Sequence, residues 1–395
     1  MLDVLVVGAG PTGLTAGCLL ARHGLSVRVV RKHPPFSGHS RASVIWPRAL
    51  EILRPLGVTA ALAPAASRVT GVGYYSSGSS IGRFGLDRLT GTDFAHALGV
   101  SQHRTEAALT AAFRAAGGEL VDAEVVGLEQ DSRRVSVRTR SDGRERVVQA
   151  RHLIGADGAG STVRELLGIA MADVGPRVSF RIADAVVSGL PEDQASYCWT
   201  PGGGLAIGPH DRHAHRLAYR LTPDAPDTSR ESFQRLLTER GPRTHRGVVR
   251  ELISTADFQA RFAVAERFSV GRCHLAGDSA HVMAPAGGQG MNSGILDAAA
   301  LSRGIVESLR NGAAKNSLAE YGAQRQDVIR KIMATAVEHA RDGGLRSAEE
   351  IAERDRRYRA MWQDPARHLE RVARLSQLHV DPARADDERA PVRTA

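Results

Sequence analysis

A short apolar strand, a glycine-rich turn and a helix follow one another at the N-terminus, and this succession restricts the fold more than any other feature. Leu2 to Val7 is a β-branched apolar run of the kind that forms a buried parallel strand. It leads into the turn Gly8-Ala9-Gly10-Pro11-Thr12-Gly13 and a helix predicted from about Gly10 to Arg22. Leu25 to Val30 then has the pattern of a second strand. The chain therefore begins with a βαβ unit, which predicts a parallel sheet.

The glycines of this turn have the spacing of a dinucleotide-binding loop. They allow a tight turn, close approach of the backbone to a pyrophosphate, and close packing of the helix on the strand. Such a site usually has Asp or Glu at the end of the second strand to bind a ribose. Here the strand runs into Arg31 and Lys32. The alternatives for Arg31 are a 2′-phosphate contact, as in NADP sites, stacking on an adenine, or a position in solvent.

A second glycine-rich segment, Gly277 to Asn292, follows the apolar strand candidate Cys273 to Ala276 and opens a helix predicted to about Leu309. Four glycines and a proline between Gly277 and Gly290 leave its backbone almost bare of side chains. Free N–H groups at a helix start attract negatively charged or electron-rich ligands. The carboxylate of Asp278, at the strand end, can accept hydrogen bonds from ligand hydroxyls. We expect this segment to form the floor of a cofactor site.

Length and patterning predict a second lobe. At 395 residues the chain exceeds the usual limit for one hydrophobic core. Gly71 to Phe84 has the pattern of a β-hairpin, and short strands and turns from about Arg177 to Phe268 predict an antiparallel sheet. Helical patterns follow at about Leu318 to His339 and Ser347 to Gln377. We expect a cofactor-binding domain formed by residues 1–70, 98–176 and 268–345. A sheet domain is expected from residues 71–97 and 177–267, and a C-terminal helical segment with a tail from residues 346–395.

Composition argues against several function classes. The formal net charge is +9, yet the chain has few lysines and its arginines are spread along the sequence, so no nucleic-acid partner is expected. Three scattered cysteines without a Cys-x-x-Cys pair fit a reducing, cytoplasmic compartment. No apolar run reaches the roughly 18–20 residues that a membrane span needs. Asp3 interrupts the N-terminal apolar stretch, which therefore is not expected to be a secretion signal.

Three motifs in order make the chain resemble the class A flavin monooxygenases of the para-hydroxybenzoate hydroxylase type. They are the first glycine turn, the run Asp157-Gly158-Ala159-Gly160-Ser161-Thr162-Val163-Arg164, and the Gly277-Asp278 segment. The resemblance extends over about Leu2 to Leu309. Further matches are Ser40-Arg41-Ala42, Glu51-Ile52-Leu53, Gln102 with Thr105, Glu106 and Leu109, and Arg267 to Arg272. The fold that it implies is α/β, with a Rossmann-like FAD-binding domain, an antiparallel-sheet substrate domain and C-terminal helices.

The resemblance also implies roles for individual residues. Asp278 would bind the ribityl hydroxyls of FAD, Gln102 the ribityl or phosphate region, and the backbone at Val125 or Val126 the adenine. The helix start at Gly290 would meet the N1–C2 carbonyl edge of the flavin, where a helix N-terminus stabilises negative charge. Arg31 departs from the acidic residue usual in the family. The complete set of implied FAD-binding residues is Gly8, Gly10, Pro11, Thr12, Gly13, Arg31, Arg41, Gln102, Val126, Asp157, Asp278, Pro285 near the reactive face, Gly288, Gly290, Met291 and Asn292.

The activity implied by the resemblance is NAD(P)H- and O2-dependent hydroxylation of an aromatic or polyketide-like small molecule through a flavin C4a-hydroperoxide. Epoxidation, Baeyer–Villiger oxygen insertion next to a carbonyl, or a reductase activity are alternatives on the same fold. An alternative from another class is a flavin-binding protein without turnover, which Arg31 favours. The sequence contains no sign of a second dinucleotide domain, consistent with transient binding of the nicotinamide cofactor.

The substrate is expected between the flavin and the antiparallel sheet. The candidates for its wall are Tyr74, Trp199, Arg216 and Tyr219, for each of which packing within the sheet is the alternative. His210, His213 and His215 have a spacing typical of metal ligands, but no carboxylate beyond Asp211 completes a set, and we predict no metal site. The sequence does not identify a catalytic base.

Overall fold

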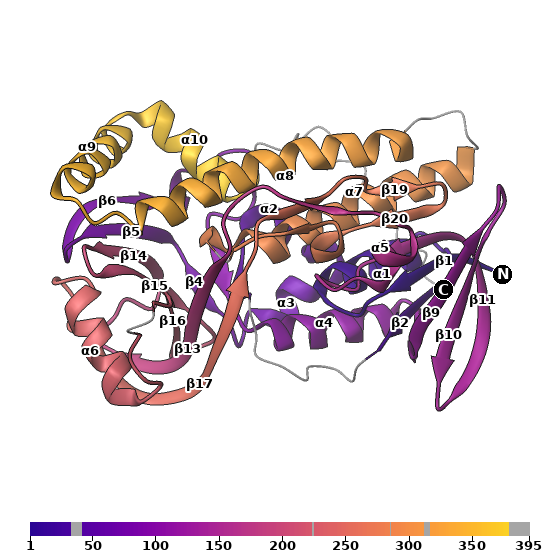
Figure 1. The fold of residues 1–395 in the computed structure, drawn as a ribbon, viewed down its shortest axis with the longest axis horizontal. Coiled ribbons are helices and arrows are strands. Elements are labelled where there is room, and N and C mark those ends of the chain that lie inside the picture. Colours follow the sequence, from indigo (N-terminus) through magenta and orange to yellow (C-terminus); the bar gives the residue numbers. More distant parts are fainter. Residues whose placement is uncertain (33–41, 223–224, 285, 312–316, 379–395) are drawn as a thin grey trace.

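The computed structural model describes residues 1–32, 42–222, 225–284, 286–311 and 317–378. It is an elongated molecule in which one sheet lies at each end and a long helix runs along both (Figure 1). The predicted α/β class is confirmed. The division into domains at the bounds given above remains a prediction. Among the described residues, no helix has the length and apolar character that crossing a membrane requires.

The first sheet has eight strands and contains the predicted βαβ unit. Its main path runs in the order β19-β20-β11-β1-β2-β8, and β9 and β10 attach to it through β11. β1 pairs in parallel with β2 on one side and β11 on the other, which confirms the parallel sheet predicted from the N-terminus. The strands are β1 (Leu2–Val7), β2 (Val27–Arg31), β8 (Glu119–Asp122), β9 (Glu124–Gln130), β10 (Val135–Ser141), β11 (Arg144–Gly155), β19 (Ser269–Val270) and β20 (Cys273–Leu275).

One strand of this sheet joins two segments that the sequence pattern separates. Arg146 to Ala150 and His152 to Gly155 have the pattern of two strands, but the structure joins them in the single strand β11. Its first half pairs antiparallel with β10, and from Ala150 onward it pairs in parallel with β1. The first half of β11 is largely exposed and its last residues are buried on both faces, so the polar pattern of the first half gives way to an apolar run.

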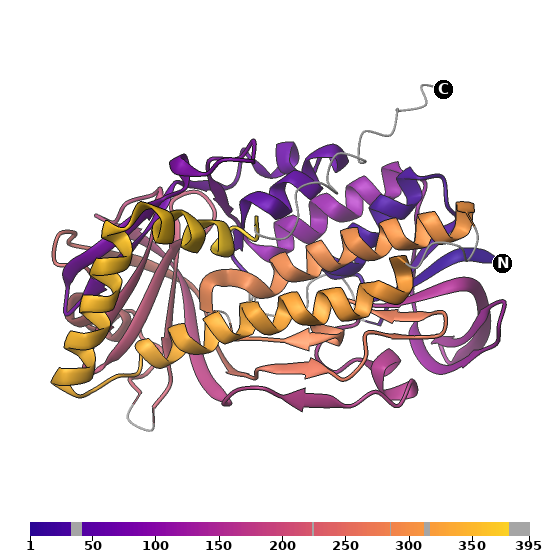
Figure 2. The ribbon, with the colours of Figure 1, turned by 90° about the horizontal axis from the view of Figure 1, so that it is seen from above.

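Helices α1 (Pro11–Arg22), α4 (Gln102–Ala115), α7 (Gln289–Asn311) and α8 (Ser317–Asp342) accompany the first sheet. The largest hydrophobic core lies between this sheet and its helices and includes Leu5, Leu14, Phe113 and Ile295. Figure 2 shows α7 and α8 lying side by side along the length of the molecule. α7 begins at Gln289, inside the second glycine-rich segment and close to the predicted helix start.

The second sheet has seven strands in the order β17-β13-β16-β15-β14-β5-β6. All neighbouring pairs are antiparallel except β14 and β5, which are parallel, so the expected antiparallel sheet has one exception. The hairpin predicted over Gly71 to Phe84 is β5 and β6, whereas the two long strands β13 and β17 were not resolved from the sequence as strands of this length. The strands are β5 (Gly71–Ser76), β6 (Ser79–Gly85), β13 (Val178–Ser188), β14 (Gln194–Thr200), β15 (Gly203–Pro209), β16 (Ala214–Arg220) and β17 (Val248–Ala260).

The described part of the C-terminal segment, up to residue 378, forms two helices that cover the β5–β6 edge of the second sheet (Figure 1). These are α9 (Ala348–Gln363) and α10 (Pro365–Leu375), and α6 (Arg230–Arg240) packs on another part of the same sheet. Smaller elements complete the chain: α2 (Pro47–Leu53), α3 (Val58–Leu62), α5 (Thr162–Leu166), β3 (Val44–Ile45), β4 (Ser67–Val69), β7 (Ala97–Gly99), β12 (Met171–Asp173), β18 (Ala263–Ala265) and β21 (His281–Val282).

Candidate functional site

Two cavities meet above the carboxyl ends of β1 and β11. The strand-end cavity, of about 740 Å³, lies among the end of β2, the first glycine turn and α4. The inter-sheet cavity, of about 780 Å³, extends from the same turn to the second sheet. Gly10, Ala156 and Gly158 belong to the walls of both. A long ligand lying across this shared wall would therefore reach both cavities.

In the first glycine turn, Gly10 leaves space for a ligand, whereas Gly13 allows α1 to pack closely on the turn. A Cβ on Gly13 would lie 1.9 Å from the carbonyl oxygen of Gly8, so glycine is needed there for α1 to approach the turn. A Cβ on Gly10 would meet nothing within 4 Å, because Gly10 faces the shared wall. In the part of the chain that the structure describes, no side chain caps the first turn of α1. The N–H groups at this helix start are thus available to an anionic ligand such as a pyrophosphate.

The Asp157 and Gly277-Asp278 motifs are joined at the end of β11. Ser279 Oγ donates to the carbonyl oxygen of Gly155 at 2.6 Å, and Arg164 Nη1 donates to the carbonyl oxygen of Ser279 at 3.2 Å. Asp157 accepts from Ser161 Oγ at 2.5 Å and from the Val163 N–H at 3.1 Å, so its carboxylate anchors the start of α5. Burial raises the pKa of Asp157, against the lowering effect of these hydrogen bonds. Its direct role in this structure is to hold the loop at the cavity wall.

Asp278 has an exposed side chain in the wall of the inter-sheet cavity. The turn that presents it is held from beneath by Asp297 of α7, which is completely buried. Asp297 accepts from the Gly277 N–H at 2.9 Å and from Arg325 Nε at 2.6 Å, and its other close partner is His281 Nε2 at 2.5 Å. Burial would raise the pKa of Asp297, but Arg325 and His281 hold it well below its usual value. Sequence reasoning missed this residue, although an aspartate within an apolar helix face was a usable signal.

The turn before α7 is fixed by hydrogen bonds from distant segments. Gly287 accepts from Trp46 Nε1 at 2.9 Å and donates its N–H to Tyr197 Oη at 3.1 Å. Asn292 accepts from the Trp46 N–H at 2.8 Å and donates to the Val44 carbonyl oxygen at 2.9 Å. The side-chain amide of Asn292 is therefore used within the protein, and its contact with the flavin edge remains a prediction. Gly288, Gly290 and Met291 do line the inter-sheet cavity.

The C-terminal helix also reaches this turn, a contact that the sequence did not predict. Gln377, which follows α10, is fully buried. Its Nε2 donates to Gln289 Oε1 at 2.6 Å and to Ser293 Oγ at 3.0 Å. Gln289 in turn donates to the carbonyl oxygen of Leu375 at 3.0 Å. The end of α10 thus supports the start of α7.

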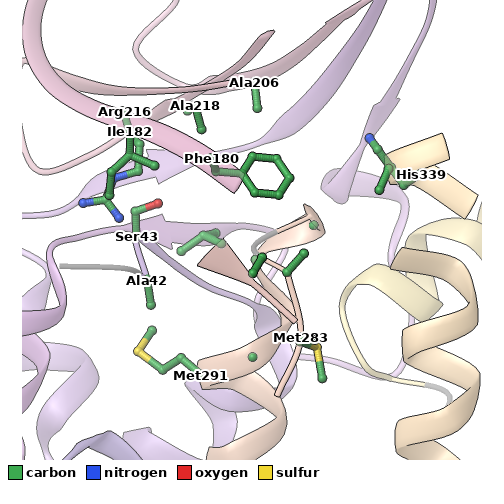
Figure 3. A pocket seen from close by; sticks show the side chains of 18 of the residues that line it. Ala42, Ser43, Phe180, Ile182, Ala206, Arg216, Ala218, Met283, Met291 and His339 are labelled. Atoms are coloured by element: carbon green, nitrogen blue, oxygen red, sulfur yellow. The ribbon is translucent and has the colours of Figure 1, made fainter. Parts of the chain in front are cut away.

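The second sheet supplies an apolar wall opposite the turn. Phe180, Ile182 and Ala218 project from it across the cavity toward Met283 and Met291 (Figure 3). Of the four predicted substrate residues, Trp199, Arg216 and Tyr219 line this cavity. Tyr74 does not, and packing, the alternative given for it, is what the structure shows. Tyr74 is fully buried in an aromatic cluster, with its ring centre 5.4 Å from that of Trp199 and 5.3 Å from that of Trp362.

Arg216 is the buried cation of this wall. Its Nε and Nη2 donate to the two carboxylate oxygens of Asp184 at 2.8 and 2.9 Å. Its Nη1 is buried and has no hydrogen-bond partner among the described residues. His339 of α8 lines another part of the cavity (Figure 3). Burial and the nearby Arg371 lower the pKa of His339 to about 3, so its ring is neutral near pH 7.

The remaining predicted residues that the structure describes are divided between the two cavities, with the exception of Gly13 and Val126. Gly8, Arg31 and Asp157 line the strand-end cavity, and Val125 rather than Val126 lies in its wall because alternate residues of a strand face opposite sides. Gln102 lies in the wall of the inter-sheet cavity, where Pro11 and Thr12 also lie. Gly13 lines neither cavity. Arg41 and Pro285 are outside the described residues.

The three histidines with metal-like spacing diverge. His210 approaches Asp184 at 3.4 Å, His213 approaches Glu192 at 3.4 Å, and His215 is 3.2 Å from the carbonyl oxygen of Pro191. Within the described ranges, no group of three or more His, Cys, Asp or Glu side chains is arranged to hold a metal ion.

The residues present fit FAD. Space for a pyrophosphate is left at Gly10, where a side chain would meet no protein atom within 4 Å. A carboxylate able to accept hydroxyl hydrogen bonds is exposed at Asp278. A bare turn and helix start at Gly288 to Met291 faces an apolar space of a size suited to a planar ring system. These features lie along the walls of two cavities that share Gly10.

Comparison with known proteins agrees with this fit. The sequence profile of the family described as FAD binding domain matches residues 1–336. A flavin-dependent monooxygenase of Mycobacteroides abscessus is 32% identical over 84% of this chain and 73% of its own length. The 12-dehydrotetracycline 5-monooxygenase/anhydrotetracycline 6-monooxygenase of Streptomyces rimosus is 33% identical over 84% of this chain and 68% of its own length.

Solved structures show the same fold. p-Nitrophenol 4-monooxygenase from Pseudomonas putida has a TM-score of 0.86 at 21% identity, covering 95% of this chain and 98% of that chain. The anhydrotetracycline hydroxylase OxyS from Streptomyces rimosus has a TM-score of 0.78 at 27% identity, covering 100% of this chain and 78% of that chain. With its matching motifs and its FAD-compatible cavities, the chain belongs to the FAD-binding-domain family and is an FAD-dependent monooxygenase of the class A aromatic hydroxylase type.

Proposed function

We propose that this enzyme uses NAD(P)H and O2 to hydroxylate an aromatic or polyketide-like small molecule held in the inter-sheet cavity. One observation carries the proposal: this cavity brings the turn at Gly288 to Met291 and the exposed Asp278 into the same space as an apolar sheet wall. FAD supplies the redox and oxygen chemistry when it is bound. The protein's part is to orient the substrate against the flavin and to keep water away.

The proposed cofactor contacts follow from the donors and acceptors present. The N–H groups at the start of α1 would bind the pyrophosphate, and the Asp278 carboxylate would accept hydrogen bonds from the ribityl hydroxyls. The start of α7, at Gly290 and Met291, would face the electron-rich pyrimidine edge of the flavin. A helix N-terminus stabilises negative charge there by about 0.3–1 kcal/mol, and by more when it is buried.

The character of the cavity wall supports an aromatic substrate. Phe180, Ile182 and Ala218 present apolar surface, which excludes water and binds a flat ring system. Arg216, whose Nη1 has no hydrogen-bond partner among the described residues, is a charged donor of the wall that we assign to an oxygen of the substrate. Several relatives carry names that fit: anhydrotetracycline monooxygenase, 2,4-dichlorophenol 6-monooxygenase and a putative polyketide hydroxylase.

The experiment that tests the function is a screen of FAD-loaded enzyme against phenols and polycyclic aromatic polyketides. We expect some of them to stimulate NAD(P)H oxidation, to require O2, and to gain one oxygen atom as a ring hydroxyl by mass spectrometry and NMR. An epoxide or an expanded lactone would favour the alternative oxygenations. Substrate reduction that proceeds without O2 would favour a reductase. No stimulation by any compound, with FAD firmly bound, would favour the non-catalytic alternative.

Replacing Asp278 with alanine is expected to weaken FAD binding by about 10–100-fold, because hydrogen bonds to a charged acceptor contribute about 1.5–3 kcal/mol. The side chain is exposed, so the fold should remain intact. Flavin content after gel filtration and fluorescence titration of the apo-protein measure the effect. Glu239→Ala, an exposed change on α6, is the control and should retain FAD normally. Unchanged affinity in Asp278→Ala would remove Asp278 from its proposed role.

Arg216 is expected to act on substrate binding rather than on FAD. Because Arg216→Gln alone would leave the buried Asp184 without its arginine partner, the variant of choice is Asp184→Asn/Arg216→Gln, which removes both charges. We expect KM for the best substrate of the screen to rise by about 10–100-fold, the loss expected for one charge-assisted hydrogen bond. Flavin content should stay at the wild-type level. Equal KM values in the two proteins would show that Arg216 only supports the sheet.

A further inference from the structure

The end of β2 carries a cation that is held in place by the neighbouring strand. Arg31 is the last residue of β2, and in the parallel pairing of β2 with β8 it stands opposite Asp122. Arg31 Nε donates to Asp122 Oδ1, and Nη2 lies 3.4 Å from Oδ2. The Arg31 side chain is 15% exposed and that of Asp122 is 69% exposed. Asp122 therefore braces the guanidinium from the solvent side.

Arg31 belongs to the wall of the strand-end cavity, whereas Asp122 does not. The ion pair uses one edge of the guanidinium, Nε and Nη2, which leaves Nη1 outside this contact. Next to it, Lys32 lines the same cavity and pairs with Glu124 at 2.7 Å. Two cations thus stand side by side where the second strand of the βαβ unit ends. In dinucleotide sites of this topology, that strand end faces the adenosine ribose.

The strand-end cavity is lined by equal numbers of carboxylates and of arginine and lysine side chains, so its cations matter through their position at the end of β2 and not through a net charge. Three carboxylates line it, and each has a partner within the protein. Glu106 accepts from Gln102 Nε2 at 2.8 Å, Asp157 is engaged by Ser161 and the Val163 N–H, and Glu124 pairs with Lys32. His103 and Arg114 of α4 add further basic groups to the wall.

A carboxylate and a guanidinium at this position would prefer different substituents on the ribose. A carboxylate accepts hydrogen bonds from the 2′- and 3′-hydroxyls and repels a phosphate attached to either of them. A guanidinium only donates, so it binds the hydroxyl oxygens as acceptors and binds a phosphate more strongly, often with two hydrogen bonds. A braced guanidinium loses less conformational entropy on binding than a mobile one does.

We propose that the strand-end cavity holds the adenosine ribose of FAD through donation from Arg31, and that it also accepts adenine nucleotides phosphorylated on the ribose, which a carboxylate at this position would reject. The inference rests on the proposed placement of the adenosine in this cavity. It makes Arg31 a specificity-determining residue and predicts that 2′-phosphorylated adenine nucleotides compete with FAD for the apo-protein.

The test is calorimetric titration of flavin-free full-length protein with adenosine 5′-monophosphate and with adenosine 2′,5′-bisphosphate. The wild-type protein should bind the bisphosphate about tenfold more tightly, as expected for new charge-assisted hydrogen bonds. The charge swap Arg31→Glu/Asp122→Arg keeps an ion pair between the strands but places the carboxylate on β2. In this variant the preference should reverse, with the monophosphate bound more tightly than the bisphosphate.

The same two strands offer a matched control. Arg28 stands opposite Glu119 in the β2–β8 pairing, their side chains pair at 2.7 Å, and neither residue lines either cavity. The swap Arg28→Glu/Glu119→Arg should leave the nucleotide preference at the wild-type value. Thermal unfolding of both swaps reports whether the strands still pair.

Two results would overturn the proposal: tighter binding of the monophosphate by the wild-type protein, or the same preference in the wild type and the Arg31 swap. Titration with FAD distinguishes failure of this proposal from failure of the proposed placement of FAD. If the wild-type protein and the Arg28 swap bind both nucleotides but not FAD, the placement of FAD fails while the nucleotide preference of the cavity is still measured. Displacement of bound FAD by the bisphosphate, followed by flavin fluorescence, should occur in the wild type and be at least about tenfold less effective in the Arg31 swap.

Discussion

Replacing Gly10 with valine is expected to prevent FAD binding while leaving the apo-protein about as stable as the wild type. Gly10 has extended backbone angles, with φ −78° and ψ 179°, and a Cβ there would meet no protein atom within 4 Å. The new side chain would instead fill the wall shared by the two cavities, where the pyrophosphate is proposed to pass. We expect FAD affinity to fall by at least about 100-fold, and the free energy of unfolding to change by about 1 kcal/mol or less.

Substitutions at two other glycines, Gly208 and Gly13, serve as controls for Gly10→Val. Gly208 of β15 also has open space around a Cβ, but it lies in the sheet wall of the inter-sheet cavity. Gly208→Val should therefore keep FAD. Gly13→Ala should do the opposite of Gly10→Val and destabilise the apo-protein by about 1–3 kcal/mol, because its Cβ would lie 1.9 Å from the Gly8 carbonyl oxygen. Normal flavin content in Gly10→Val would place the pyrophosphate elsewhere.

Replacing Asp297 with alanine is expected to lower the free energy of unfolding by about 3–5 kcal/mol, because it leaves Arg325 and His281 buried without their shared anion. The turn that presents Asp278 also loses the acceptor of the Gly277 N–H, so FAD retention should fall as well. Chemical denaturation of apo- and FAD-loaded protein measures both effects. Asp327→Ala removes an exposed ion pair with Lys331 on α8 and should cost about 1 kcal/mol or less. Equal costs for the two variants would contradict the role given to the buried network.

The contribution of Asp297 and its partners to stability should decrease as the pH falls. Because the folded protein lowers the pKa of Asp297, its contribution to stability is complete above the usual carboxyl range and is lost as the pH falls below that range. In Asp297→Asn, this part of the acid dependence should disappear. Unfolding measured between pH 7 and pH 3 in the wild type and in the variant tests the point. Parallel pH profiles in the two proteins would show that other groups control acid unfolding.

Local patterns along the chain determined a large part of this fold. The run Leu2 to Val7, the glycine turn and the helix after it determined β1 and α1, because strand and helix periodicities are properties of neighbouring residues. The spacing of glycine and aspartate at Gly277-Asp278 likewise located a turn that lines the cavity. The hairpin of β5 and β6 followed from the alternation and turn residues of Gly71 to Phe84. The order of these motifs was sufficient to predict the family.

Tertiary structure alone decided the features that depend on distant partners. Periodicity shows that Tyr74 and Trp199 are sheet residues, but only the packing of α9 and α10 places Tyr74 in a closed aromatic cluster while Trp199 reaches the cavity. Arg31 and Asp122 are 91 positions apart, and Gln289 and Gln377 are 88 apart. Their contacts depend on how the strands and helices are packed together. A sequence pattern restricts the face on which a side chain lies, but the element that packs against that face is chosen by the whole fold.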